Sequence, residues 1–536
     1  MSKQQAAIRE IWMVSREYGN IAGAGGVKDV VAGLSVTLAA RSECSVHVVL
    51  PCYGFMDPEQ LGFFPLPDQT TPDAQFQFET DLHYPDKERK EQVKVWVAQK
   101  KKVTIYLLDA ARFREKHNVY TYTVEEQQLQ AWKEKGEGHV DYFAMNILLQ
   151  KASLDLMMLL DARPNVIHCH DGHTAVLPAM LAELPGYRNY FRDSGCVVTV
   201  HNAGRGYHQE IADLDFAVAS TGLTRTRIFS SLLDDNFDPF LAGGEFAILN
   251  TVSENYAREL RETADDLLTG WLGHTLLERN INLEGITNGI DSSLFSAKFP
   301  KKTGVAAAFD ILRDKNLTGK KKCKEAILQL VNGEQEIPGI KRSGSLEQDS
   351  FLPLITFIGR LSDQKGVDIL TSALDTLLRK RRDFQFLLLG SGGQQEENAL
   401  VALSSQKKNR GKVCILRGFD TLLASKIYAA GDFFVIPSRY EPCGLTDFMA
   451  QLFGNLPIVH HVGGLVKVLD GRTGFAYTKQ SSVQLANTME RALDVYRTSP
   501  AIIRDMQRQA VELIEKKYTW KMVSQQYLDL YEKSQT

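Results

Sequence analysis

The sequence predicts an α/β protein built from two doubly wound domains. Its 536 residues exceed the ~250–300 that a single hydrophobic core supports. Short apolar, β-branched runs alternate with helical patterns along most of the chain, which is typical of α/β layers. These runs are mostly continuous rather than alternating, as expected for strands that are buried on both faces of a parallel sheet.

The predicted strands fall into two groups. In the first half they span residues 11–15, 46–50, 103–108, 166–170, 197–201 and 248–252. In the second half they span residues 354–358, 384–389, 413–416, 433–436 and 457–459. Helical patterns follow several of them, as at residues 367–381 and 445–453. The chain therefore predicts two sheets, each with its own helices.

The alternation breaks once, and the break predicts a domain boundary near Asp291. Residues 301–350 are rich in Lys, Gly and Gln and carry no strong strand pattern. We expect a helix at residues 320–330 and a polar loop at 332–350. The first domain would then span residues 1–290 and the second 291–519.

The last segment, residues 520–536, has the pattern of a closing helix. Val523, Tyr527 and Tyr531 lie near one helical face. We expect this helix to pack back on the first domain.

Composition excludes several classes of protein. The 62 Lys and Arg against 65 Asp and Glu give a net charge of −3, without the basic excess of a nucleic-acid binder. Seven cysteines with no CxxC pair do not form a disulfide scaffold and suggest a reducing compartment. No apolar leader and no run of about 18–20 apolar residues is present. We expect a cytoplasmic protein that binds neither nucleic acid nor membrane.

Ligands of paired α/β domains bind at the carboxyl ends of the strands, so the segments that follow strands are the candidate sites. The first is GAGG at Gly23–Gly26, before a helix that opens near Lys28. Its backbone, with Gly25 and Gly26, could approach a phosphate closely. The spacing is not a dinucleotide fingerprint, and a simple tight turn is the alternative.

The second segment is HCHDGH at His168–His173. His168 and His170 lie on one face of a strand because side chains alternate. A metal site is one interpretation, but no second Cys or His cluster supplies further ligands. Neutral imidazoles that bind a polar ligand are favoured, and a structural role for the histidines is the remaining alternative.

Three segments of the second half carry charge or glycine after strands. GRLSDQKG places Arg360 and Lys365 where two cations suit an anionic group, although both could be solvated surface residues. PSRYEPCGLT places Glu441 just before a helix, where it could receive a sugar hydroxyl or merely cap the helix. Cys443 as a nucleophile is a weaker reading, because no base is evident nearby. HHVGGL adds a glycine turn at Gly463 and Gly464.

Together these segments suit a nucleotide-diphosphate ligand. A diphosphate leaving group gains negative charge in the transition state, and fixed cations and N–H donors stabilise that charge. No acidic DxD cluster is evident to hold a divalent ion. We therefore expect Arg360 and Lys365 to act in place of a metal, and no cofactor.

The chain resembles the bacterial-type glycogen and starch synthases, which are retaining glycosyltransferases of the GT-B fold with two Rossmann-like domains. PSRYEPCGLT is the most specific block of the resemblance. The others, in order, are the turn at Gly25–Gly26, HCHDGH, TVHN, TVSENYARE, ITNGID, GRLSDQKG, GFD and VGGL. The resemblance implies transfer of glucose from ADP-glucose or UDP-glucose, with ADP-glucose favoured, to an α-1,4-glucan.

The resemblance also implies roles for individual residues. Arg360 and Lys365 would hold the donor diphosphate, and Glu441 would contact the 3- and 4-hydroxyls of the transferred glucose. His173 would contact its 6-hydroxyl and shield the anomeric carbon. The remaining implied donor contacts are Asn288, Phe419 against the base, and the segment Cys443, Gly444, Leu445 and Thr446, beside the glycines of the two turns.

The chain departs from the family in its first half. The lysine that opens the family's KxGGL turn is Gly23 here, and Lys28 lies five residues on. Gly172 replaces a tryptophan, and the acceptor-side segment Ala203–Gln209 reads AGRGYHQ. In the second half, Lys467 replaces a frequent Asp. The catalytic set of the second domain is therefore intact, and the donor and acceptor contacts of the first domain are altered.

Four functions compete. The leading one is elongation of an α-1,4-glucan. The altered first-domain segments favour, as a second, a GT-B transferase with another acceptor. A glucan-binding protein without turnover is a third, disfavoured because Arg360, Lys365 and Glu441 are retained. A nicotinamide oxidoreductase is the fourth, and it lacks the required fingerprint.

Overall fold

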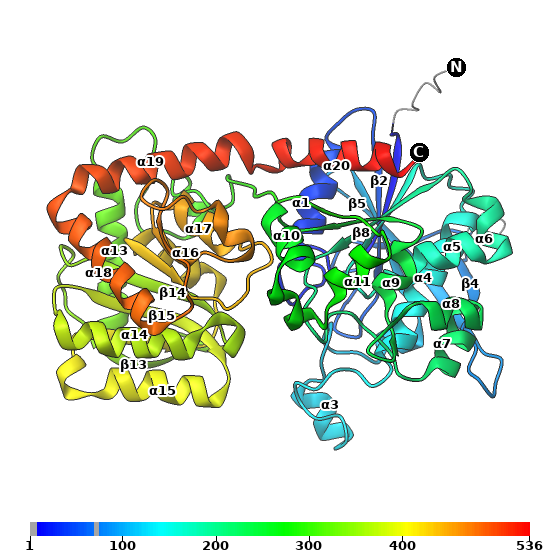
Figure 1. Cartoon of the computed structure of the whole chain (residues 1–536), viewed down its shortest axis with the longest axis horizontal. Helices are drawn as coiled ribbons and strands as arrows, with labels where there is room; N and C mark the ends of the chain where they lie inside the picture. The colour runs from blue at the N-terminus through cyan, green and yellow to red at the C-terminus, as the bar shows by residue number, and fades with distance from the viewer. Residues whose placement is uncertain (1–7, 69–73, 536) are drawn as a thin grey trace. The chain divides into compact units, whose positions relative to one another are not determined.

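The computed structural model describes residues 8–68 and 74–535 and divides into two compact units. Unit 1 comprises residues 1–289 and 520–536, and unit 2 comprises residues 290–519. The chain therefore passes between the units twice. The last helix, α20 (Trp520–Ser534), packs on α1 (Val27–Ala39) and β8 (Gly195–Val200) of unit 1 (Figure 1). Its residues Val523, Tyr527 and Tyr531 are fully buried.

Unit 1 contains a mixed sheet with the strand order β12-β11-β8-β7-β1-β2-β6-β5-β3, and β4 pairs with β5. The strands from β12 to β6 run parallel. Their bounds are β1 Glu10–Val14, β2 Ser45–Pro51, β6 Val103–Asp109, β7 Val166–His170, β8 Gly195–Val200, β11 Ile248–Thr251 and β12 Leu283–Gly285. The six strands predicted in this half are all present, and the predicted α/β class is confirmed.

The antiparallel edge of this sheet was not predicted. It consists of β3 (Phe64–Pro65), β4 (Gln77–Asp81) and β5 (Lys90–Lys100). In β5, buried residues such as Val93 and Val95 alternate with exposed charged ones. A strand with one solvent-exposed face lacks the continuous apolar run by which buried parallel strands are recognised in a sequence. A separate short hairpin pairs β9 (Leu232–Leu233) with β10 (Asn236–Phe237).

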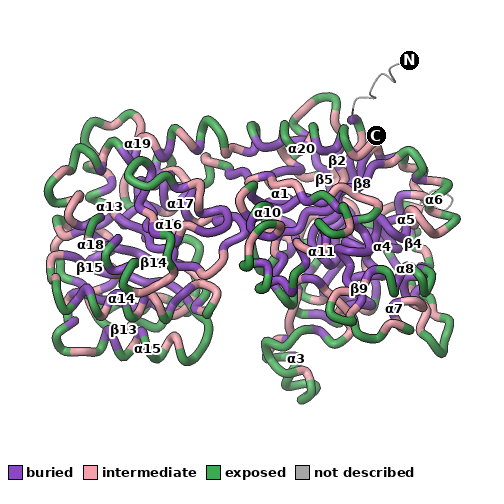
Figure 2. The backbone as a smooth tube through the Cα atoms, in the orientation of Figure 1, coloured by how far each residue is buried: buried purple, intermediate pink, exposed green. Residues whose placement is uncertain are grey.

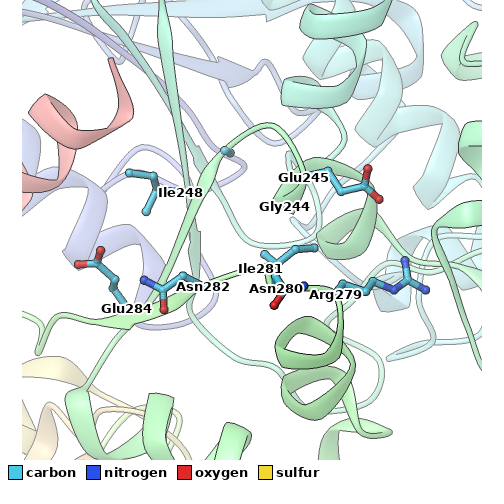
Figure 3. Close-up of a pocket in the computed structure, with 9 residues that line it drawn as sticks. Gly244, Glu245, Ile248, Arg279, Asn280, Ile281, Asn282 and Glu284 are labelled. Carbon is cyan, nitrogen blue, oxygen red and sulfur yellow. The ribbon is translucent and has the colours of Figure 1, made fainter. Parts of the chain in front are cut away.

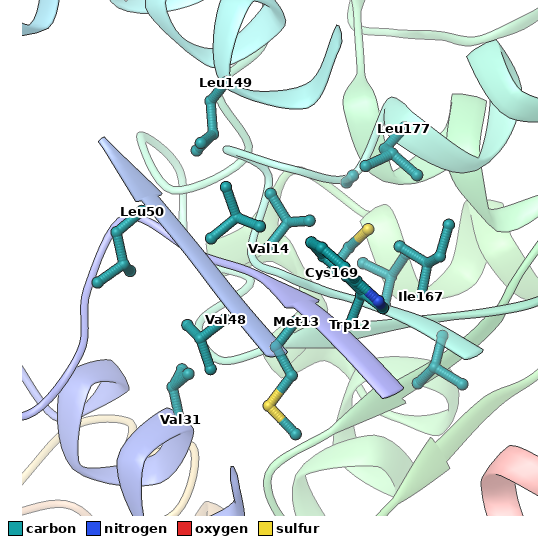
Figure 4. Close-up of a cluster of buried hydrophobic side chains, with 14 of the residues drawn as sticks. Trp12, Met13, Val14, Val31, Val48, Leu50, Leu149, Ile167, Cys169 and Leu177 are labelled. Carbon is teal, nitrogen blue, oxygen red and sulfur yellow. The ribbon is translucent and has the colours of Figure 1, made fainter. Parts of the chain in front are cut away.

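The helices of unit 1 pack partly against strands and partly against one another. They are α1 Val27–Ala39, α2 Ala111–Arg114, α3 Val124–Leu129, α4 Tyr142–Leu159, α5 Leu177–Glu183, α6 Pro185–Tyr190, α7 Leu214–Thr221, α8 Arg225–Ser230, α9 Pro239–Gly244, α10 Glu254–Glu262, η1 Ala264–Thr269 and α11 Leu272–Glu278. Figure 4 shows the resulting core: Trp12, Met13 and Val14 of β1 lie among side chains of β2, α1, α4 and α5.

Unit 2 contains a sheet with the order β13-β16-β15-β14-β17-β18-β19, parallel except for β13. The strands are β13 Lys341–Leu346, β14 Leu354–Leu361, β15 Gln385–Gly392, β16 Lys412–Arg417, β17 Phe433–Ile436, β18 Leu456–His460 and β19 Phe475–Tyr477. The helices are α12 Pro300–Thr303, α13 Thr318–Asn332, η2 Asp363–Lys365, α14 Val367–Lys380, α15 Gln394–Ser405, η3 Lys407–Asn409, α16 Thr421–Ala430, α17 Thr446–Leu452, η4 Gly463–Lys467, α18 Ser482–Thr498 and α19 Pro500–Lys517.

One sequence prediction in this unit is wrong. Residues 332–350 are not only a polar loop, because β13 pairs antiparallel with β16 within them. The strand reads KRSGSL and is largely exposed, so only Leu346 is buried. A polar edge strand has no apolar run, and the sequence therefore gave no strand signal there.

The two faces of the unit 2 sheet explain the continuous apolar runs. Successive residues of β14 enter different cores: Leu354 and Ile358 join one cluster, and Ile355 and Phe357 join the other. Because side chains alternate across a strand, helices on both faces require apolar residues at every position. Figure 2 shows this buried interior beneath an exposed helical surface in unit 2. Among the residues described, no helix is long and apolar enough to span a membrane.

Candidate active site

Strand order brings the unit 2 motifs to one edge of the sheet. β14 lies between β15 and β17, β18 follows β17, and all four strands run parallel. The segments after β14, β17 and β18 therefore emerge at the same carboxyl edge. These segments carry GRLSDQKG, PSRYEPCGLT and HHVGGL.

Lys365 and Glu441 form the ion pair at the centre of this edge. Nζ of Lys365 lies 2.6 Å from Oε2 of Glu441, which also accepts a 3.0 Å hydrogen bond from the hydroxyl of Ser438. Burial would raise the pKa of Glu441, but the Lys365 ammonium, the Ser438 hydroxyl and the more distant Lys467 hold it below its ordinary value. Glu441 is therefore an ionised carboxylate at neutral pH.

Arg439 fastens the two loops that carry this pair. Its guanidinium binds both carboxylate oxygens of Asp368, at 2.9 and 2.8 Å, and donates to the carbonyl of Asp363 at 2.8 Å. Its backbone N–H donates to the carbonyl of Gln364. A planar guanidinium in two-point contact fixes orientation as well as distance. Sequence reasoning missed this positioning role, because Arg439 and its partners lie more than 70 positions apart.

The glycine turn after β18 packs directly on the backbone of the Glu441 loop. The N–H of Gly464 donates to the carbonyl of Glu441 at 2.9 Å. A Cβ on Gly463 would lie 2.0 Å from that carbonyl oxygen, and one on Gly464 would lie 2.1 Å from the carbonyl oxygen of Cys443. Both positions therefore require glycine, because two backbones meet there.

Lys467 also joins the Glu441 loop to the glycine turn after β18. Its buried ammonium donates to the carbonyls of Cys443, Gly444 and Gly464, and it pairs with the buried carboxylate of Asp447 at 3.2 Å. Burial raises the pKa of Asp447 to about 6, and the Lys467 ammonium opposes that rise. At this departure from the family pattern, Lys467 thus supplies a structural cation that joins the two turns.

The remaining predicted donor residues lie at or near this edge. Arg360 is an exposed residue near the end of β14, and its guanidinium approaches Gln364 at 3.4 Å. Cys443 and Gly444 are buried, Leu445 precedes α17, and Thr446 is its first residue. Phe419, after β16, is 70 % exposed and presents its ring to solvent. Arg360 and Phe419 are thus accessible, whereas the Cys443–Thr446 backbone is held in place.

In unit 1, Glu17 organises the glycine turn between β1 and α1. Its Oε2 accepts hydrogen bonds from the N–H groups of Ala24 and Gly25 at 2.9 and 3.1 Å. Its Oε1 accepts a short hydrogen bond from the hydroxyl of Tyr120. A side chain on Gly23 would meet the stem of Lys28, because the added Cβ would lie 2.4 Å from Cδ of Lys28. The Lys28 stem thus crosses the place where a side chain at position 23 would begin.

The histidines of HCHDGH are neutral and largely hydrogen-bonded within the protein. His168 contacts the hydroxyls of Tyr531 and Thr199 at 2.8 and 2.7 Å, and His170 contacts His201 at 3.0 Å. Burial lowers the pKa of His168 to about 3 and that of His170 well below its ordinary value. No group of three or more metal-binding side chains occurs among residues 8–68 and 74–535.

His173 differs from the other two histidines because its ring faces Tyr120, at 5.1 Å between ring centroids. Burial, with smaller contributions from Arg16 and His201, lowers the pKa of His173 well below 6.5. Asp171 holds the surrounding turns: its Oδ1 accepts the N–H of His201 at 2.7 Å, and burial raises its pKa to about 8. His173 is therefore a neutral imidazole on a fixed loop.

Two of the departures from the family pattern fit each other. A Cβ on Gly172 would lie 2.1 Å from the carbonyl oxygen of His208. The backbone of the altered segment, residues 203–209, thus fills the space beside Gly172. His208 in turn bridges Asp238 at 2.7 Å and the carbonyl of Ala203 at 2.8 Å, and the Asp238 carboxylate outweighs burial and raises the pKa of His208 to about 9.

Unit 1 also contains a buried amide side chain, and a pocket that lies away from the predicted site residues. Asn288 is buried, and its Oδ1 has no hydrogen-bond partner within the described part of the chain. A pocket of about 460 Å³ lies at the opposite, amino end of β11 and β12, lined by Arg279, Asn280, Asn282 and neighbours (Figure 3). None of the predicted site residues lines it.

Two family models of glycosyltransferases match the chain, one in each half. The family model described as starch synthase catalytic domain matches residues 10–274, and that described as glycosyl transferases group 1 matches residues 352–494. A glycogen synthase of Streptococcus agalactiae is 31% identical, covering 98% of this chain and 100% of the relative. Glycogen synthase 1 of a Synechococcus strain is 30% identical, covering 97% and 99%.

A solved structure shows the same fold. It is the catalytic domain of starch synthase IV from Arabidopsis thaliana bound to ADP and acarbose, with a TM-score of 0.76 and 23% identity over 99% of this chain and 100% of that one. The fold is therefore GT-B. The family model and the glycogen synthase relatives show that the chain is a hexosyltransferase. From these similarities over nearly its whole length, the chain belongs to the glycogen and starch synthase family of glycosyltransferases.

Proposed function

We propose that this enzyme transfers glucose from a nucleotide-glucose, ADP-glucose in preference to UDP-glucose, to the non-reducing end of an α-1,4-glucan with retention of the α configuration. The observation that carries the proposal is the mostly buried Lys365–Glu441 ion pair, held by Arg439 at the sheet edge where Arg360 also lies. The resemblance of PSRYEPCGLT to the bacterial-type synthases favours ADP-glucose.

The proposed chemistry uses charges that exist before substrate binds. Arg360 and Lys365 stabilise the diphosphate as the bond from the anomeric carbon to phosphate breaks. The ionised Glu441 accepts hydrogen bonds from the glucose 3- and 4-hydroxyls, so the sugar is oriented without a covalent intermediate. The acceptor hydroxyl attacks from the face that the phosphate leaves, and its proton passes to that phosphate. We expect activity to survive EDTA, and its loss would contradict this assignment.

Unit 1 supplies uncharged contacts and one cation in the proposal. His173, neutral at pH 7, contacts the glucose 6-hydroxyl and shields the anomeric carbon. The buried Asn288 Oδ1 accepts a hydrogen bond from a hydroxyl of the same sugar. Lys28, whose stem occupies the place of a side chain at position 23, provides the phosphate contact that Gly23 lacks.

The test offers ADP-glucose and UDP-glucose separately, with glycogen as acceptor, and measures label in the polymer. We expect incorporation, faster from ADP-glucose. Incorporation from neither donor would refute glucan elongation.

The second candidate function is transfer of glucose to another acceptor. One observation favours it: the segment 203–209 packs over Gly172. Release of nucleotide diphosphate with a small sugar acceptor, but not with glycogen, would establish that alternative.

A further inference from the structure

We propose that Trp132 is the contact point of a second glucan-binding site, on a segment that stands out from unit 1. The segment, called here the aromatic excursion, spans residues 121–138 and contains α3. Figure 1 shows α3 away from the sheet of unit 1. No sequence motif pointed to this segment.

The aromatic excursion is an ordered structure with a closed base. Backbone hydrogen bonds join Tyr122 to Glu137 and Gly136, and the N–H of His139 donates to the carbonyl of Tyr120. A capping box starts α3, with the Thr123 hydroxyl and the Glu126 carboxylate each binding the other's backbone N–H. The segment therefore holds its tip in a defined position, so ligand binding there requires little further ordering of the protein and costs little conformational entropy.

The tip presents an aromatic ring to solvent. Trp132 is 58 % exposed, and its ring meets Tyr122 edge-on at 5.8 Å between centroids. Tyr122 is buried and lies 5.0 Å from the ring of the buried His139. The Lys133 ammonium lies 5.4 Å from the Trp132 ring and 5.7 Å from the Tyr122 ring. The Trp132 ring thus packs on the buried Tyr122 and remains accessible to a ligand from solvent.

The chemistry around the ring favours a neutral, hydroxylated ligand. The excursion carries four Glu and two Lys, which disfavours a nucleic acid or an anionic surface. The Lys133 ammonium lies beside the apolar indole, and Gln128 and Gln130 are exposed amide side chains of the same segment. A pyranose ring has this same mixture, because its C–H face is apolar and its hydroxyls are polar. Stacking that face on indole removes apolar area from water while the hydroxyls stay hydrogen-bonded.

The base of the excursion adjoins the candidate active site. Tyr120, just before the excursion, places its ring 5.1 Å from that of His173 and donates its hydroxyl to Glu17. A glucan held at Trp132 would therefore be tethered to the unit that carries His173. Tethering raises the local concentration of chain ends, and it matters more for a long polymer than for a short one. The identity of the polymer rests on the proposed function.

The test measures glucan binding without donor, by retardation in native gels that contain glycogen. We expect W132A to bind glycogen about fivefold more weakly, and W132F to recover most of the affinity, since an aromatic face remains. F351A is the matched control, because Phe351 is an exposed ring of unit 2 with the Lys321 ammonium 4.0 Å from its centroid. Unchanged retardation of W132A would overturn the inference.

Kinetics separate this inference from the proposed function. We expect W132A to raise KM for glycogen while leaving kcat and the rate with maltotriose unchanged. If the wild type elongates glycogen and W132A has the same KM for glycogen, the second binding site is refuted and the proposed function is not. A wild type that binds glycogen through Trp132 but transfers no glucose would refute the proposed function alone.

Discussion

Nζ of Lys365 lies 2.6 Å from Oε2 of Glu441, and the two residues come from loops that follow neighbouring parallel strands. Each charge lies mostly buried, and the Lys365 ammonium stabilises the ionised form of Glu441. In the proposed reaction, this pair places a cation for the diphosphate beside a carboxylate for the sugar.

Replacing Glu441 by Gln should lower kcat by at least about 100-fold, because the neutral amide no longer orients the sugar or balances Lys365. Steady-state kinetics with glycogen measure the effect, and circular dichroism checks the fold. E347Q is the matched control, since Glu347 also pairs with a lysine, Lys412, at 2.8 Å but lies outside the site loops. An E441Q enzyme within twofold of wild type would exclude the role of Glu441.

Replacing Lys467 by Met should destabilise unit 2 by about 3–5 kcal/mol, because Asp447 would be left as an unpaired buried acid. Denaturant unfolding measures the loss. The double variant K467M/D447L should recover much of it, since removing both charges leaves neither uncompensated. Equal unfolding midpoints for K467M and wild type would show that the ion pair contributes nothing.

Replacing Lys28 by Met should raise KM for the nucleotide-glucose about tenfold and leave KM for glycogen unchanged. The methionine stem keeps the packing over Gly23, so the variant tests the charge alone. K28R is the matched control, because it keeps the cation. An unchanged donor KM in K28M would mean that Lys28 does not take over the phosphate contact.

The stability of unit 1 should fall as pH rises through about 9. Asp238 raises the pKa of His208 from 6.5 to about 9 in the folded protein. Because the folded state binds this proton more tightly, the stabilisation is fully present below pH 6.5 and is lost through pH 9, by at most about 3 kcal/mol. Thermal unfolding of wild type and H208Q between pH 6 and 10 measures this. Parallel pH profiles of the two proteins would contradict it.

The sequence predicted those strands that are buried on both faces, because only they carry continuous apolar runs. β14 and β17 are examples. β5 was missed because one of its faces is exposed, and β13 was missed because most of the strand is exposed. The same limit applies around the candidate site. Glu441 and Lys365 stand in recognisable motifs, but Arg439 acts through Asp368, 71 positions away, and no local pattern records that contact.

The departures from the family pattern show a second limit. Gly172 and the segment 203–209 look like independent changes along the chain, yet the backbone at His208 fills the space beside Gly172. Lys467 looks like the loss of an acid, yet its ammonium joins three carbonyls and Asp447. Compensation of this kind depends on distances that one sequence does not contain.

The central claim is the addition of glucose to the non-reducing end of an α-1,4-glucan with retention. Its most direct test incubates the enzyme with ADP-glucose and maltotriose and follows the product by NMR, with E441Q in parallel. We predict maltotetraose with a new α-1,4 linkage and one ADP released per glucose transferred, and no product from E441Q. A β linkage, a product of another acceptor only, or equal turnover by E441Q would contradict the account.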